Sequence, residues 1–100
     1  MKVTEDWWAT AALAETLMQA HEALSRARPK PGTRDPRVWR DYHLRSAAIY
    51  TEVAQIDRGH FHEATAWATC ERQRGEEFDR QIKSKNAGNA SASSSVDKAS

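Results

Sequence analysis

The sequence predicts an all-α protein in which three antiparallel helices are followed by a disordered C-terminal tail. Three observations predict this class. Seventeen of the 100 residues are alanine, against four glycines and three prolines, and this composition favours helices over strands. Apolar residues recur at spacings of three and four, which is the period of an amphipathic helix. The three prolines all lie in one short stretch between two such periodic segments.

The first helix is expected from about residue 5 to residue 27. Thr4 is a suitable N-cap residue, and the acidic Glu5 and Asp6 suit the positive end of the helix dipole. One apolar stripe then follows at spacings of four, three and four residues: Leu13, Leu17, Ala20 and Leu24.

The second helix is predicted from residue 36 to about residue 58. Residues 28–35 precede it and are expected to form a loop, because this stretch contains two prolines and a glycine. An aspartate followed by a proline, Asp35 and Pro36, is a strong helix start. The helix carries a seam of heptad spacing, which predicts close packing along one face: Trp39, Tyr42, Ser46, Ile49, Val53 and Ile56.

A glycine decides how the chain continues. The apolar phase of the second helix stops at Gly59, and a new stripe follows: Phe61, Ala64, Ala68, Gly75, Phe78 and Ile82. We therefore predict a tight turn at Gly59 and a third helix from about residue 61 to residue 82. The alternative is a kink in one long helix, where an interior glycine costs about 1 kcal/mol. Glu71 falls inside the new stripe, which is either an error in this assignment or a polar contact.

The last 17 residues, 84–100, contain almost no large apolar side chain. Such a segment cannot offset an ordering entropy of roughly 1–2 kcal/mol per residue, so we predict a helical domain over residues 1–83 and a disordered tail. A domain of this size buries only about 60% of its unfolded surface. The three helices are therefore expected to form either a small bundle or a helical hairpin that dimerises.

Several classes of protein are disfavoured by composition. The single cysteine, Cys70, excludes a disulfide scaffold. The apolar runs are far shorter than the roughly 18 residues that a membrane span requires. Glu5 and Asp6 stand where a signal peptide would have a basic segment, so we expect a cytoplasmic protein. No catalytic constellation or phosphate-binding loop is visible, so we expect no enzymatic activity and no cofactor.

Four tryptophans are many for a small helical domain, and exposed aromatic side chains are typical interface anchors. The first hypothesis is therefore a non-enzymatic protein–protein interaction or regulatory module. It would dock on a partner protein, or on a second copy of itself, through an aromatic-edged helical face. The expected anchors are Trp8, Trp39, Tyr42 and Tyr50. The alternative for these residues is ordinary packing within the helical domain.

The second hypothesis is nucleic-acid binding. The chain has a net charge of only +1, but residues 26–45 contain seven arginines and lysines against two aspartates. Cations interleaved with aromatic residues suit phosphate backbones and stacked bases. The residues that would carry this function are Arg34, Arg37, Arg40 and Arg45. The alternative is a solvated basic loop with ion pairs on the helix surface.

The third hypothesis is a metal site at Asp57, His60 and Glu63. These are suitable ligands for a first-row metal, and His60 and Glu63 share a helix face because they are three residues apart. The alternative is a capping turn in which polar side chains bind the free N–H groups of the third helix.

The stretch DPRVWRDYHLRSAAIYTEVAQIDRGHFHEATAWATCERQRGEEF, from Asp35 to Phe78, resembles a family of small, functionally uncharacterised helical proteins of actinomycetes. The resemblance covers the second and third predicted helices. It implies a cytoplasmic, non-secreted helical protein, and it brings no catalytic residues with it.

Overall fold

The computed structural model describes residues 6–93, with side chains through residue 86, and within this range it contains helices and no strand. The prediction of an all-α protein is therefore confirmed. In chain order the elements are α1 (Trp7–Ala12), α2 (Leu17–Ala27), α3 (Pro36–Ile56), the short 3-10 helix η1 (Arg58–His60) and α4 (Phe61–Ser93).

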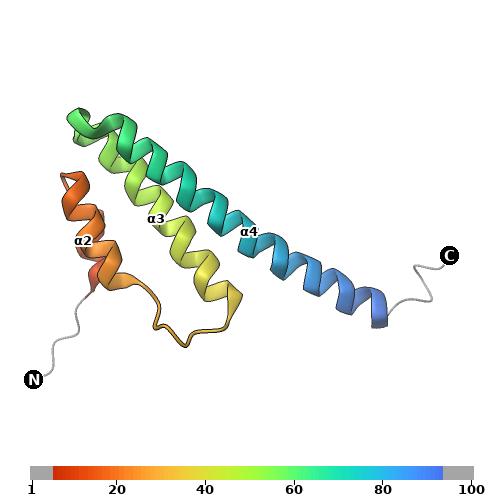
Figure 1. Cartoon of the computed structure of the whole chain (residues 1–100). Helices are drawn as coiled ribbons and strands as arrows, with labels where there is room; N and C mark the ends of the chain where they lie inside the picture. Colours follow the sequence, from red (N-terminus) through yellow and green to blue (C-terminus); the bar gives the residue numbers. More distant parts are fainter. Residues whose placement is uncertain (1–5, 94–100) are drawn as a thin grey trace, which may run out of the picture.

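Helices α3 and α4 form a long antiparallel hairpin (Figure 1). The start of α3 is the predicted one, since the Asp35 carboxylate accepts a hydrogen bond of 2.9 Å from the Arg37 N–H. The predicted tight turn at Gly59 is also confirmed, because η1 separates α3 from α4 there. The alternative of one long kinked helix is thus wrong, and α3 ends at Ile56, slightly before the predicted position.

The prediction of one helix over residues 5–27 is wrong, because the chain breaks between α1 and α2. Asp6 caps α1 by accepting from the Ala9 N–H, and Thr16 caps α2 by accepting from the Gln19 N–H. Two good N-caps in one stretch start two helices instead of one. The proposed cap Thr4 lies outside the described residues.

The break removes Leu13 from the predicted apolar stripe, and this side chain is 79% exposed. The rest of the stripe is buried as predicted: Leu17, Ala20 and Leu24.

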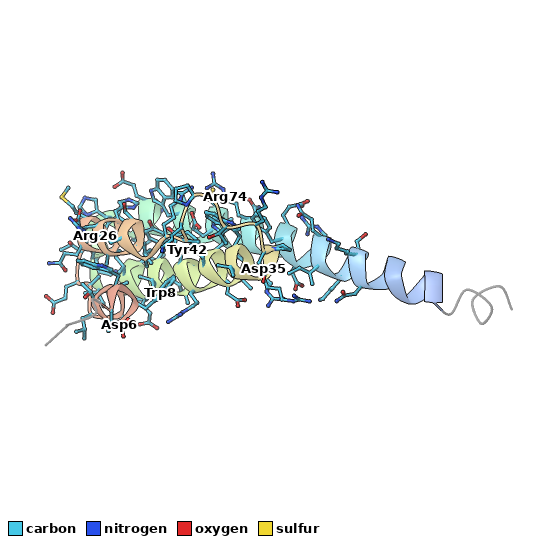
Figure 2. All side chains as sticks on the ribbon, turned by 90° about the horizontal axis from the view of Figure 1, so that it is seen from below. Asp6, Trp8, Arg26, Asp35, Tyr42 and Arg74 are labelled. Atoms are coloured by element: carbon cyan, nitrogen blue, oxygen red, sulfur yellow. The ribbon has the colours of Figure 1, made fainter. Side chains whose placement is uncertain are left out.

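The two short helices pack against each other, and α2 packs against α3. Helix α2 runs along α3 from the end nearest the Gly59 turn, with the Leu17 N–H 2.9 Å from Asp57 Oδ2 and the Leu24 carbonyl 3.0 Å from the Tyr42 hydroxyl. Figure 2 shows Trp8 of α1 on the opposite side of the molecule from Arg74 of α4. The result is a flat molecule of 56 × 41 × 18 Å. It differs from the predicted set of three antiparallel helices of similar length, because the first predicted helix is divided.

Helix α4 is longer than predicted. It continues to Ser93 instead of ending near Ile82, and its last turns project beyond the start of α3 (Figure 1). Residues 94–100 lie outside the described part of the chain, and the disordered tail over residues 84–100 stays a prediction. Extending a helix that is already formed adds one hydrogen bond per ordered residue, so it requires less apolar burial than starting a new one.

Small residues line the contact between α3 and α4, with Ala47 and Ala54 on one helix and Ala64, Ala68 and Gly75 on the other. Small side chains allow two helix backbones to approach closely. At Gly75 the space is filled by the partner helix, since an added Cβ would lie 2.5 Å from Leu44 Cδ2 and 2.6 Å from Leu44 Cγ.

Gly75→Ala is therefore expected to destabilise the hairpin. Alanine is favoured over glycine inside a helix by about 1 kcal/mol. Overpacking against Leu44 costs about 1–3 kcal/mol, so a net loss near 1 kcal/mol is expected in the free energy of unfolding. Thermal unfolding followed by circular dichroism measures it. Gly32→Ala is the control, since nothing lies within 4 Å of a Cβ at that position. An unchanged or raised Tm for Gly75→Ala would contradict the close approach.

Candidate functional site

Two of the four predicted aromatic anchors belong to the core. Tyr42 and Tyr50 are only 8% and 5% exposed, and both hydroxyls are bonded internally. The Tyr42 hydroxyl donates to the Leu24 carbonyl, and the Tyr50 hydroxyl lies 2.7 Å from His21 Nδ1. The face of α3 that carries them is covered by α2, which the sequence did not indicate. We therefore assign both tyrosines to packing and exclude them as surface anchors.

Burial also determines the protonation of these hydroxyls. It raises the pKa of Tyr42 and of Tyr50, and the negative charge of Glu71 raises both further. Both phenols therefore remain protonated at neutral pH.

The other two predicted anchors, Trp8 and Trp39, are half-buried and each carries an arginine over its ring. The Trp39 Nε1–H donates to the Thr33 carbonyl at 2.9 Å, which holds the loop before α3 against this ring. The Trp8 ring meets Tyr42 edge-on, with 5.8 Å between centroids, and the Arg45 guanidinium lies 4.1 Å from its centroid. A cation over an indole face is attracted by the ring quadrupole, so these contacts fix the orientation of both side chains.

Trp8 forms one wall of an open groove, which we name the α1–α3 groove. Its volume is about 300 Å³, which is the lower end of the range for ligand pockets. It is lined by Trp8, Ala27, Pro29, Val38, Asp41, Tyr42 and Arg45. Most of this lining is apolar, and Val38 remains 41% exposed. The groove is therefore a site where an apolar group from outside would gain burial.

Two of the four arginines of the nucleic-acid hypothesis are engaged by other side chains of the chain. Arg40 donates to Asp41 at 2.9 Å and to Asp79 of α4 at 3.3 Å, and these bonds raise its pKa, Asp41 most strongly. Arg45 lies over Trp8 at the groove. Only Arg34 and Arg37, in the loop and the first turn of α3, remain as exposed cations without such contacts among the described residues.

The three residues of the metal hypothesis lie close together but do not converge. Asp57 Oδ2 accepts from the Leu17 N–H and contacts His60 Nδ1, both at 2.9 Å. His60 Nε2, on the other side of the ring, lies 3.9 Å from Glu63 Oε1. Within residues 6–86 no three histidine, cysteine or acidic side chains are grouped so that they could hold a metal ion.

Asp57 instead caps a helix far away in the sequence. The Leu17 N–H is at the start of α2, and this hydrogen bond, followed by that of His60, lowers the pKa of Asp57. A capping turn was predicted here as the alternative to a metal site, but for the third predicted helix. Asp57 caps α2 instead, and this could not be predicted because the break before Leu17 was not expected.

Asp57→Asn is expected to lower the Tm at neutral pH by a few degrees, because a charged cap of α2 is lost. A carboxylate with a lowered pKa contributes stability above its unfolded value of 3.8, and this contribution is lost as the pH falls below it. The variant should therefore lose less stability than the wild type between neutral pH and the pH range below 3.8. Thermal melts across pH measure this. Glu63→Gln is the control at neutral pH, and equal effects of the two variants would contradict the cap.

His43 and Glu71 form a buried pair between α3 and α4 that was not predicted from the sequence. His43 Nδ1 lies 2.6 Å from Glu71 Oε1, and the two residues are 6% and 7% exposed. The imidazole is stacked between Trp39 and Phe78, with centroid distances of 6.1 and 5.8 Å. The position of Glu71 inside an apolar stripe was the only signal for it, and the polar-contact interpretation is the correct one.

None of the described helices combines the length and apolarity needed to cross a membrane. Comparisons with protein-family models, with curated proteins and with solved structures found no match to this chain, so functional arguments rest on its geometry.

Proposed function

We propose that this chain is a non-enzymatic protein-interaction module that binds a segment of a partner protein in the α1–α3 groove. The observation that carries the proposal is an apolar groove of about 300 Å³ with a rigid aromatic wall and a charged rim. The docking residues are then Trp8 and Val38, with Arg45 at the rim. Of the four expected anchors, Trp8 alone belongs to this set of docking residues. Val38 and Arg45 are new members of it, and Trp39 does not line the groove.

The construction of the groove supports binding of a side chain. Trp8 is held on one face by Arg45 and at its edge by Tyr42, so little ordering entropy is lost when a partner contacts it. Binding energy at protein interfaces concentrates where an apolar anchor fills a desolvated pocket with a polar rim. One large apolar side chain from a partner, placed beside Val38, would satisfy this description.

The same features favour a protein over a nucleic acid. Nucleic-acid binding without sequence preference requires cations along a continuous path and aromatic faces open for stacking. Here the Trp8 face is covered by Arg45, the Trp39 ring is flanked by Arg28 and His43, and Arg40 is paired with two aspartates. Nucleic-acid binding is therefore the alternative that the test below must distinguish from binding of a protein segment.

The test is selection of a random short-peptide library displayed on phage against the full chain. Val38→Glu, which places a charge in the groove, is expected to abolish binding of most selected peptides. Ile56→Glu is the matched control, because Ile56 is on the same helix and is 54% exposed, but lies outside the groove. Peptides that bind the wild type and Ile56→Glu, but not Val38→Glu, support the proposal.

Two outcomes would overturn it. One is the absence of any peptide whose binding depends on Val38. The other is tight binding of a fluorescein-labelled single-stranded DNA, weakened by Arg34→Gln and Arg37→Gln and falling steeply with salt, which would favour the nucleic-acid function.

A further inference from the structure

We infer that the segment which docks in the α1–α3 groove is acidic. This inference rests on the proposed function and adds the charge of the partner to it. It follows from the balance of charged side chains around the groove and from the contacts that each of them makes.

The acidic side chains near the groove are already bonded within the chain. Asp41, which lines the groove, accepts from the Arg40 Nε–H at 2.9 Å. Asp35 caps α3 by accepting from the Arg37 N–H, and Asp6 caps α1 by accepting from the Ala9 N–H. These carboxylates have hydrogen-bond donors, so they are poor sites for a cationic partner.

Among the described residues, the cations near the groove are not paired with carboxylates. Arg45 lines it, and Arg28 and Lys30 flank Pro29, which also lines it. Within the described residues none of these three lies within 4.0 Å of a carboxylate oxygen. Uncompensated positive charge at a rim attracts acidic segments and raises their association rate.

Arg45 is suited to hold a carboxylate directly. Its guanidinium carbon lies 4.1 Å from the centroid of Trp8, so the indole holds this group at the groove. A guanidinium carries five N–H donors in a rigid plane, and two of them can donate parallel hydrogen bonds to one carboxylate. Because the side chain is already ordered by the indole, binding costs less entropy than it would for a free arginine.

The spacing within the groove predicts where that carboxylate stands in the partner. Val38 and Arg45 are seven residues apart on α3, which corresponds to about 10 Å along the helix axis. An extended segment spans this distance in about three residues. The partner segment should therefore carry an aspartate or glutamate about three positions from its apolar anchor.

The test repeats the phage selection on the wild type and on Arg45→Glu. Lys30→Glu is a second charge-reversing variant, and it lies in an exposed loop. It keeps the test valid if Arg45→Glu does not fold. The wild type is expected to select Val38-dependent peptides with net negative charge and an acidic residue about three positions from an apolar one. Arg45→Glu and Lys30→Glu should weaken those peptides by about tenfold at low salt, and much less at high salt. Arg45→Glu should also select basic peptides in their place.

Each outcome is decisive. Val38-dependent peptides that are neutral or basic would overturn the acidic partner and leave the proposed function intact. Acidic peptides whose affinity is unchanged by both Arg45→Glu and Lys30→Glu would also overturn the acidic partner and leave the proposed function intact. A selection without Val38-dependent peptides would overturn the proposed function, and the acidic partner with it.

Discussion

Glu71→Ala is expected to remove about 1–3 kcal/mol from the free energy of unfolding, because it leaves the imidazole of His43 buried between α3 and α4 without its hydrogen-bond partner. The whole stability of a small domain is roughly 5–15 kcal/mol, so this loss is a large fraction of it. The loss arises because the imidazole, stacked between Trp39 and Phe78, cannot reach water to replace the carboxylate. Urea denaturation followed by circular dichroism measures the effect.

Two further variants show how much of this loss of stability comes from the burial of the His43–Glu71 pair. Glu77→Ala also removes an ion pair from α4, that with Arg80, but both of those side chains are exposed, so little change is expected. The double variant His43→Leu with Glu71→Met replaces the buried pair by apolar groups and should recover most of the lost stability. If Glu71→Ala and Glu77→Ala had equal effects, the pair would not be desolvated as described.

Leu24→Ala is expected to cost about 2–5 kcal/mol, the usual range for removing a large side chain from a filled core. Leu24 is 2% exposed and lies where α2 packs on α3. The hydrogen bond from the Tyr42 hydroxyl uses the backbone carbonyl of Leu24, so it persists in the variant and the loss reports packing alone.

Met18→Ala is the matched control, because Met18 is on the same helix and is 79% exposed. It should leave the free energy of unfolding almost unchanged. Urea midpoints of the two variants, compared at equal slope, give the difference. Similar losses for both positions would mean that α2 is not packed on α3 along the stripe that contains Leu24.

The sequence predicted the hairpin of α3 and α4 well, because local rules control each of its features. Asp35 and Pro36 start α3 through a cap and a fixed backbone angle. The change of apolar phase at Gly59 marks the turn, since each helix buries its own stripe. None of these features depends on residues far away in the chain.

The candidate site was predicted only in part. Exposed aromatic residues were expected from the number of tryptophans, and Trp8 does line the groove. Tyr42 and Tyr50 were expected as surface anchors, but the pattern of a single helix does not say which of its faces another helix covers. Because α2 covers both side chains, the two tyrosines are buried and bonded to α2.

By itself the sequence determined that the protein is helical, where α3 begins and where the chain turns back, because capping, proline geometry and apolar periodicity act within a few residues. Thr16 is a local cap at the start of α2, but only the tertiary structure completes this N-terminus, because the Leu17 N–H donates to Asp57 at the far end of α3. The tertiary structure also decided that His43 meets Glu71, and that Trp8 meets Arg45 beside an open groove. These pairs join residues distant in sequence, and no local pattern specifies which of them come within contact distance.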